Sequence, residues 1–167
     1  EAGYENGEGF PVVEYLYNTS DAHKAVAEAL QYMWEEELGV KVTLNNQEWA
    51  AFLQTRKDGD YSIARNGWIA DYNDPISFLD MWMTGGGNND AQYENEEYDS
   101  LIKEAKTTTD VKERMELLHK AEDKIIGEDN ALAPLYFYTQ KYMLADGIEG
   151  LYYCPLGYFF FGYTHQA

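Results

Sequence analysis

One arginine and one aspartate have types and spacing that could hold a charged ligand. Arg65 lies in an apolar segment between Ala64 and Asn66. A guanidinium in such a setting needs a partner, because an isolated charge is costly to bury. A carboxylate is a suitable partner, since it accepts two parallel hydrogen bonds from a guanidinium. Asp71 follows six residues later and offers a counter-charge for an ammonium group, so the two residues could hold both ends of a zwitterion.

Both residues also have an ordinary structural interpretation. Arg65 could form a structural ion pair with one of the 30 acidic residues. Asp71 could be a turn or capping residue, which is a common role for aspartate. Spacing leaves these alternatives open, but they differ in one respect: truncating a structural ion pair destabilises the fold.

The remaining polar residues give no positive support for catalysis or metal binding. His23, His119 and His165 are far apart, so they lack the spacing of a zinc site. There is no Gly-x-Ser-x-Gly motif, and the single cysteine, Cys154, has no motif partner and excludes an internal disulfide. We therefore expect no enzyme, no cofactor and no metal. His23 begins a helix just beyond a strand end, where a ligand contact is reasonable.

Composition argues against several kinds of partner. The 167 residues include 30 acids and 12 bases, which gives a formal net charge of −18. This balance disfavours nucleic acid and anionic membrane surfaces, because both require clustered Lys and Arg. No apolar run reaches the roughly 18 residues of a membrane-spanning helix. Aromatic residues make up 16%, which fits a peptide-binding or sugar-binding surface and a tyrosine-rich core equally well.

Alternating strands and helices must position Arg65 and Asp71. Three segments rich in β-branched and aromatic residues predict strands: 12–17, 40–44 and 61–68. Two amphipathic segments predict helices that end at glycines: 22–38 and 48–57. This order predicts a parallel sheet with crossover helices. Ligands of such sheets bind beyond the carboxyl ends of the strands, which here lie near 18–23, 46–49 and 68–73.

The second half of the sequence is predicted to be helical and then strand-like. Helices are expected over 76–83, 96–106 and 111–126, the last with an Asp110–Glu113 capping box and a stop at Gly127. The glycine-rich loop 84–90 lacks the Lys-Ser/Thr ending of a phosphate-binding loop. Strands are expected over 131–138 and 141–144, and the aromatic tail 151–163 has no clear period.

Several short motifs occur in a characteristic order along the sequence. They are Asn18-Thr19-Ser20-Asp21-x-His23-Lys24, Leu38-Gly39-Val40, Asn46-Gln47-Glu48-Trp49, Ala64-Arg65-x-Gly67-Trp68-x-Ala70-Asp71-Tyr72-Asn73-x-Pro75 and Pro134-Leu135-Tyr136-Phe137-Tyr138. This series resembles the bacterial oligopeptide-binding proteins, the family 5 solute-binding proteins of ABC importers. The opening Glu1-Ala2-Gly3-Tyr4 looks like the end of a helix, which we interpret as a truncation.

The resemblance implies an α/β fold class: one lobe of a periplasmic-binding-protein-like (type II) fold, with a mixed sheet and flanking helices. In that family two lobes enclose a peptide, a hinge closes them, and the permease of the ABC transporter reads the closed form. The chain would then divide into a truncated helix end with a connector (1–10), a ligand-binding lobe (11–144) and a tail that returns to the other lobe (145–167).

The resemblance also implies partners, a location and roles for the charged residues. The partners are an oligopeptide, the permease subunits and a missing N-terminal lobe, and the location is outside the cytoplasmic membrane of a bacterium, in the periplasm or as a cell-surface lipoprotein. Asp71 matches the acid that pairs with the peptide α-ammonium. Arg65 and His23 match the basic pair that meets the peptide C-terminal carboxylate.

Three aromatic residues match positions that line side-chain pockets in this family: Trp49, Trp68 and Tyr138. The sequence departs from the family pattern at Asn66 and Ile69, where smaller residues are usual. Peptide length and pocket shape therefore stay open.

Two alternatives to oligopeptide binding remain. Relatives of the family carry dipeptides, nickel complexes or oligosaccharides, but Arg65 and Asp71 favour peptides because a sugar needs no paired end charges. A free-standing carbohydrate-binding module would fit the tyrosine and tryptophan content. Such a module is usually a β-sandwich, which the alternating strands and helices argue against.

Overall fold

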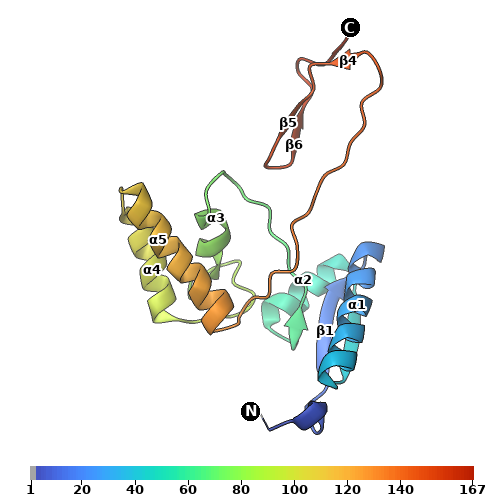
Figure 1. The fold of residues 1–167 in the computed structure, drawn as a ribbon, viewed down its shortest axis with the longest axis vertical. Helices are drawn as coiled ribbons and strands as arrows, with labels where there is room; N and C mark the ends of the chain where they lie inside the picture. Colours follow the sequence, from blue (N-terminus) through green and yellow to red (C-terminus); the bar gives the residue numbers. More distant parts are fainter. Residues whose placement is uncertain (1–2) are drawn as a thin grey trace. The chain divides into compact units, whose positions relative to one another are not determined.

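The structure is a computed structural model that describes residues 3–167. It divides into two units (Figure 1). The first unit consists of Glu1–Gly67 with Gly87–Gln92, and the second consists of Trp68–Gly86 with Tyr93–Ala167.

The predicted helix end at residues 1–4 begins with Glu1 and Ala2, which lie outside the described residues; Gly3 itself has the left-handed φ of +86°. Along residues 3–167, no helix combines the length and the apolar character that crossing a membrane requires.

The first unit has the predicted order of alternating strands and helices. Its elements are β1 (Val13–Asn18), α1 (Asp21–Leu38), β2 (Val42–Gln47), α2 (Trp49–Asp58) and β3 (Ile63–Ala64). The strands are parallel in the order β2-β1-β3, which confirms the predicted sheet. The crossovers β1 to β2 and β2 to β3 run in opposite directions across the sheet. Right-handed crossovers therefore place α1 and α2 on opposite faces, as Figure 1 shows.

The core of the first unit forms between α1 and one face of the sheet. Tyr15 and Tyr17 alternate along β1 and are each 4% exposed, and they cluster with Ala27 of α1 and Val42 of β2. The Trp34 ring meets Tyr15 edge to face, with centroids 6.1 Å apart. Successive residues of a strand point to opposite faces, so Leu16, which is fully buried, faces the side of α2. Burial of each such side chain stabilises the fold by about 1.5–3 kcal/mol.

Both helices of the first unit end at a glycine in the left-handed region. Gly39 follows α1 with φ +66°, and Gly59 follows α2 with φ +72°. A Cβ at Gly39 would overlap the backbone carbonyl of Asn6, which cannot move away without shifting the chain. A Cβ at Gly59 would meet the end of the flexible Gln92 side chain. The two glycines therefore share a backbone conformation but differ in available space.

Substitution of Gly39 by alanine is expected to lower the free energy of unfolding by about 2 kcal/mol or more, and Gly59→Ala by about 1 kcal/mol. The left-handed backbone destabilises both variants, and the overlap with Asn6 adds to the loss at Gly39. Urea unfolding of the two variants side by side measures the difference. Equal losses would show that the close approach of Asn6 to Gly39 contributes nothing.

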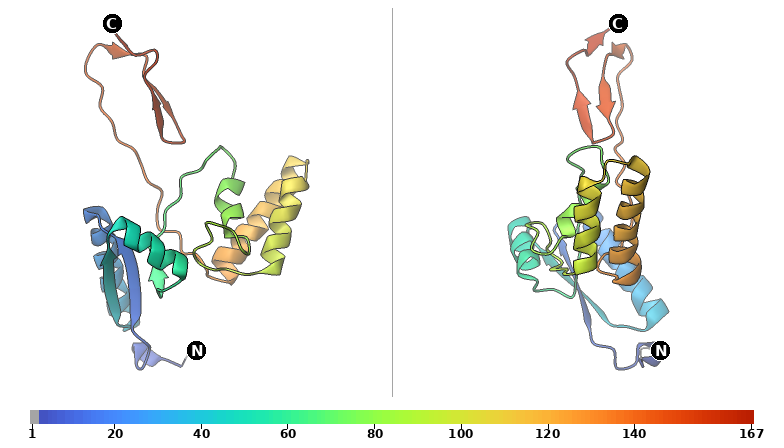
Figure 2. Two further views of the ribbon diagram at one scale, coloured as in Figure 1. Left: turned by 180° about the vertical axis from the view of Figure 1, so that it is seen from behind. Right: turned by 90° about the vertical axis from the view of Figure 1, so that its left-hand side faces the viewer.

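The second unit is built around a helical hairpin. Its helices are α3 (Ile76–Leu79), α4 (Glu96–Thr107) and α5 (Val111–Glu122), and α4 and α5 lie side by side (Figure 2). Tyr98, Ile102 and Leu118 are buried between them, and the Tyr98 hydroxyl donates to the Leu79 carbonyl at 2.6 Å. Asp110 caps α5 by accepting from the Glu113 N–H at 2.9 Å, which confirms the predicted cap.

Two predicted boundaries of helices and strands are wrong. Gly127 does not end the last helix, because a wider helical turn, Asp123–Glu128, continues past it. The third strand covers two residues instead of the eight predicted. It pairs with β1 on one side, and the chain leaves the sheet after Arg65, whose N–H still donates to the Leu16 carbonyl.

The expected strands over 131–138 and 141–144 do not form. Neither stretch takes part in a strand pairing among the described residues. From residue 133 onward their side chains are exposed, up to 94% at Phe137 and 97% at Met143. Composition makes these segments suited to a sheet, but a strand requires a neighbour to complete its hydrogen bonds.

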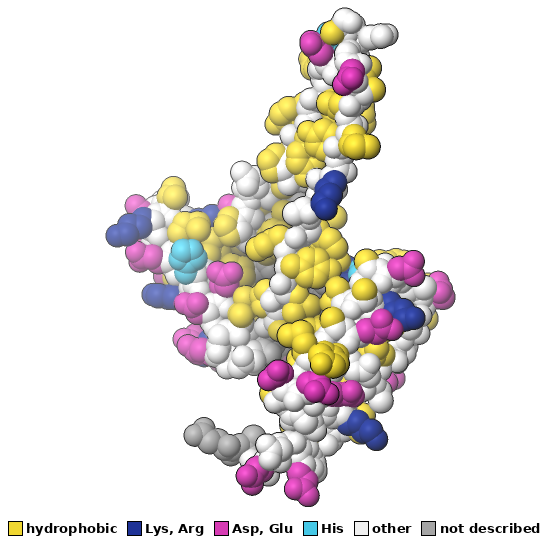
Figure 3. Space-filling view, turned by 45° about the vertical axis from the view of Figure 1, so that its right-hand side comes forward, with side chains coloured by type: hydrophobic (Ala, Val, Ile, Leu, Met, Phe, Trp, Pro, Cys, Tyr) yellow, Lys and Arg dark blue, Asp and Glu magenta, His cyan; other side chains and the backbone are white. Residues whose placement is uncertain are grey.

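The tail forms a hairpin that the sequence did not indicate. Strands β5 (Tyr152–Cys154) and β6 (Tyr158–Phe160) pair antiparallel across a turn that contains Gly157 at φ +91°. Strands β4 (Ile148–Glu149) and β7 (His165–Gln166) pair beside the chain end. Apolar side chains cover much of the visible surface of this C-terminal segment (Figure 3).

Candidate functional site

Asn18, the last residue of β1, brings two predicted site residues together. Its side-chain oxygen accepts a hydrogen bond from Arg65 Nη1 at 3.3 Å, and its backbone carbonyl lies 3.3 Å from His23 Nδ1. Asn18 is 8% exposed, so these contacts are made by a buried residue. Arg65 and His23 therefore converge at the carboxyl end of the central strand, which is where ligands bind in parallel sheets.

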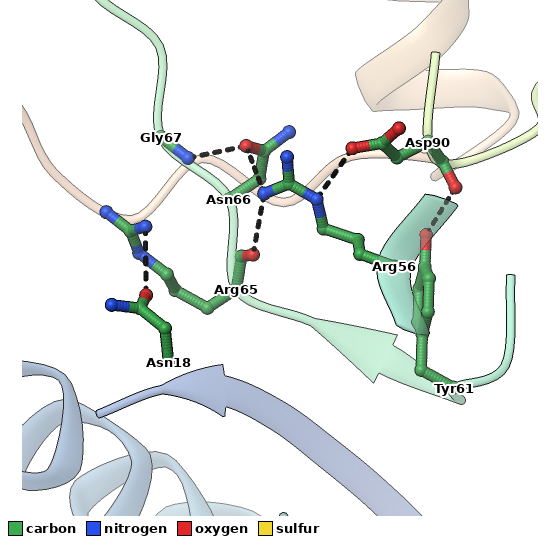
Figure 4. A network of polar contacts seen from close by, with 7 residues as sticks. All are labelled: Asn18, Arg56, Tyr61, Arg65, Asn66, Gly67 and Asp90. Atoms are coloured by element: carbon green, nitrogen blue, oxygen red, sulfur yellow. Dashed lines mark hydrogen bonds and ion pairs between the residues drawn. The ribbon is translucent and has the colours of Figure 1, made fainter. Parts of the chain in front are cut away.

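The position of Arg65 follows from the short third strand. The Arg65 N–H donates to the Leu16 carbonyl at 2.8 Å, which continues the β1–β3 pairing by one residue beyond Ala64. The Arg65 side chain is half-buried and turns toward Asn18 (Figure 4). The guanidinium thus contacts the neutral Asn18 amide at the edge of the sheet.

The electrostatics of this cluster favour an anion. Burial and the positive charge of Arg65 lower the pKa of the His23 ring, and the hydrogen bond with Asn18 opposes this in part. His23 is therefore neutral at neutral pH and protonates more readily when a negative charge arrives. A half-buried guanidinium beside a titratable imidazole is suited to receiving a carboxylate.

A second polar network lies beside Arg65 (Figure 4). Arg56 Nε forms an ion pair with Asp90 Oδ2 at 2.7 Å, and Arg56 Nη1 donates to Asn66 Oδ1 at 2.9 Å. The Tyr61 hydroxyl donates to the Asp90 carbonyl at 2.7 Å. The sequence prediction missed this network, because Arg56 and Asp90 are 34 residues apart and no local pattern links them.

Asp71 lies in the second unit, in a loop with a fixed backbone. Its N–H donates to the hydroxyl of the buried Ser77 at 3.0 Å, while its own side chain is exposed. Asp74 closes the loop by accepting from the Ile76 N–H at 2.9 Å and from Arg114 Nη2 at 2.8 Å. The hydrogen bond from Arg114 holds the pKa of the Asp74 carboxyl below its ordinary value. The Asp74-Pro75 pair before a helix was a usable signal for this turn.

The three predicted aromatic residues divide between the units. Trp49, at the start of α2 in the first unit, is 53% exposed and stacks on Phe52 with centroids 5.8 Å apart. Trp68 and Tyr138 belong to the second unit. The Trp68 indole nitrogen is buried without a hydrogen-bond partner among the described residues. The Tyr138 hydroxyl lies 3.3 Å from that of Tyr136.

The site residues thus fall into two sets. His23, Trp49 and Arg65 belong to the first unit, and Trp68, Asp71 and Tyr138 belong to the second. Within residues 3–167, no cluster of histidine, cysteine and carboxylate side chains has the arrangement of a metal site. The basic residues of the first set are chemically suited to an anion, and the exposed carboxylate of Asp71 is suited to a cation.

Known proteins similar to this chain are binding proteins. The "Periplasmic oligopeptide-binding protein OppA" of Salmonella typhimurium is 42% identical over 137 residues, which cover 82% of this chain and 25% of the relative. The "Dipeptide-binding protein DppE" of Bacillus subtilis is 39% identical over 154 residues, which cover 92% of this chain and 28% of the relative. The chain thus spans about a quarter of the length of these relatives.

A solved structure supports the same relationship. The crystal structure of Haemophilus influenzae OppA in complex with the peptide RPPGFSPFR matches with a TM-score of 0.79 and 35% identity, over 89% of this chain and 29% of that one. The model of the bacterial extracellular solute-binding proteins, family 5 (middle), matches residues 1–90, more than half of the chain. The chain belongs to the family 5 bacterial extracellular solute-binding proteins.

Proposed function

We propose that this chain is the C-terminal lobe of a receptor that binds oligopeptides outside the cytoplasmic membrane and delivers them to an ABC permease. The observation that carries this proposal is the convergence of Arg65 and His23 on Asn18 at the carboxyl end of β1. The names of the relatives, which include a periplasmic oligopeptide-binding protein, support both the ligand class and the location.

In this proposal the peptide is held at its two charged ends. Arg65 and His23 receive the C-terminal carboxylate, and Asp71 pairs with the α-ammonium. Trp49, Trp68 and Tyr138 line pockets for the peptide side chains. Support comes from the exposed carboxylate of Asp71 on a fixed loop and from the solved relative that holds a peptide.

The receptor binds its ligand without transforming it. Residues 11–144 form the ligand-binding lobe, residues 145–167 return to the other lobe, and an N-terminal lobe supplies the rest of the enclosure. Closure of the lobes on the peptide creates the form that the permease recognises. The chain spans only about a quarter of the length of these relatives, which supports the need for a second lobe.

Mass spectrometry of the ligands that co-purify with the complete receptor tests the proposed ligand class. Peptides with free termini are the expected result. A bound sugar or metal complex would contradict the proposal. The length of the bound peptides also tests a second candidate, dipeptide binding, which the similarity to a dipeptide-binding relative favours: that candidate requires ligands of two residues.

Peptide affinity is expected to rise as the pH falls from about 7.5 to 5.5, by less than the limit of about tenfold per pH unit for uptake of one proton. The free receptor has a lowered His23 pKa, and the arriving carboxylate raises it. The complex therefore binds more protons than the free receptor, and affinity decreases as the pH rises. Calorimetry across this pH range measures the effect.

Two histidine variants provide the matched comparison for this pH dependence. His23→Gln is expected to remove it, whereas His119→Gln should retain it, because His119 is exposed on α5. A peptide with an amidated C-terminus should show a flat profile with the unmodified receptor. Retention of the pH dependence in His23→Gln would assign the proton uptake to another group.

A further inference from the structure

Arg56 is held on several sides and is largely buried. Its side chain is 13% exposed, and that of its partner Asp90 is 15% exposed. The guanidinium also lies over the Phe52 ring, 5.1 Å from the centroid. Asp90 neutralises the charge of Arg56 at a distance of 2.7 Å. Arg56 is thus fixed by these partners, and the Arg56–Asp90 pair carries no net charge.

The remaining contacts of Arg56 go to the backbone segment that carries Arg65. Nη1 donates to Asn66 Oδ1 at 2.9 Å and lies 3.5 Å from the Arg65 carbonyl. The Gly67 N–H donates to the same Asn66 oxygen at 2.7 Å. These contacts hold Arg65–Gly67 directly after a strand of two residues. Such a short strand gives the segment little support of its own, because each ladder supplies few hydrogen bonds.

We propose that Arg56, held by Asp90, is a positioning residue that fixes the direction from which Arg65 receives the peptide carboxylate. Arg56 acts through the Asn66 amide and not by touching the ligand. Asp90 is in turn held by Tyr61, whose hydroxyl donates to the Asp90 backbone carbonyl at 2.7 Å. This role depends on the proposed function, because it presumes that Arg65 binds the carboxylate.

The test measures two forms of one tripeptide with the complete receptor, the free acid and the C-terminal amide. Lysine at position 56 keeps the charge but cannot reproduce the forked contacts of a guanidinium. Arg56→Lys is expected to weaken binding of the acid by roughly tenfold, the lower end of the loss seen when the partner behind a metal-binding residue is removed. Binding of the amide should change by less than about twofold, so the acid-to-amide preference falls.

Arg114→Lys is the matched control, because Arg114 forms an ion pair of similar length, 2.8 Å, with Asp74 in the second unit. The control should leave the acid-to-amide preference unchanged. Asn66→Ala is the second variant, since it removes the amide through which Arg56 acts and leaves the buried Arg56–Asp90 pair intact. If Arg56→Lys does not fold, Asn66→Ala should still lower the preference, and an unchanged preference there would overturn the proposal.

A double substitution separates positioning from direct contact. In an Arg65→Ala background, Arg56→Lys should cause no further loss of acid binding. A further tenfold loss would show that Arg56 contacts the peptide itself, and equal losses for acid and amide would show a purely structural role. Either result would overturn the positioning role. An unmodified receptor without any acid-to-amide preference would instead contradict the proposed function.

Discussion

Replacement of Arg65 by alanine is expected to weaken the binding of a free-acid peptide to the complete receptor by roughly 100-fold. A hydrogen bond to a charged group contributes about 1.5–3 kcal/mol, and loss of the guanidinium leaves the enclosed carboxylate with one partner fewer. The same peptide as a C-terminal amide should lose less than about threefold, because it brings no charge to the site. Calorimetry with both peptides measures the contrast.

The stability of the Arg65 variant decides between the two interpretations of this residue. A structural ion pair would make Arg65→Ala less stable by about 3–5 kcal/mol. A ligand-binding arginine held by the Asn18 amide should change the free energy of unfolding by only about 1 kcal/mol. Arg65→Lys is the matched variant, which keeps the charge and loses the paired geometry. A large loss of stability with unchanged peptide preference would reject the binding role.

Replacement of Asp71 by asparagine is expected to weaken the binding of a peptide with a free amino terminus by roughly 30-fold. The substitution keeps the shape of the side chain and removes the charge that pairs with the α-ammonium. A peptide with an acetylated amino terminus should bind both forms of the receptor alike. Fluorescence titration with the two peptides tests this expectation.

The fold around Asp71 should not change in this variant. The Asp71 side chain is exposed and its backbone is held by Ser77, so the free energy of unfolding should stay within about 0.5 kcal/mol. Asp74→Asn is the contrasting substitution, because Asp74 accepts from Arg114 in an ion pair. It should lower stability, and its effect on the two peptides should be equal. Equal losses for both peptides in Asp71→Asn would contradict the role of Asp71.

Much of the first unit was predictable because its signals are local. The strand and helix periods, and the glycines after α1 and α2, depend on residues close in the sequence. The parallel order follows from the alternation of strands and helices. The cap of α5 by Asp110 was predictable for the same reason.

The errors lie where structure depends on distant neighbours. The segment around Phe137 has the composition of a strand, yet among the described residues it pairs with none. The β5–β6 hairpin has no Asn-Gly turn. Pro155 and Gly157 are typical β-turn residues and indicate the turn, which the Gly157 N–H closes by donating to the Cys154 carbonyl at 2.8 Å, but they do not indicate which strands pair across it. Strand formation in both cases is decided by partners, which composition does not specify.

The candidate site was predictable in its charged residues but not in their supports. Arg65 stands out because a charged residue within an apolar strand segment is uncommon. Asp71 stands out because it follows a strand end, where ligands bind. Asn18 contacts Arg65 and His23, and Ser77 accepts from the Asp71 N–H; only the folded chain reveals these contacts. The Arg56–Asp90 pair joins α2 to a loop 34 residues away.

The amide of Asn18 has a consequence for how such a receptor could be silenced or redesigned. An amide oxygen orients the guanidinium of Arg65 without cancelling its charge. An aspartate at the same position would present a carboxylate at the same atom, and it would occupy Arg65 as an internal substitute for the ligand. Replacing the amide nitrogen of Asn18 with oxygen would thus give Arg65 a carboxylate partner within the chain, and this partner would compete with the ligand of the proposed site. In the proposed site, the neutrality of residue 18 therefore matters as much as the charge of residue 65.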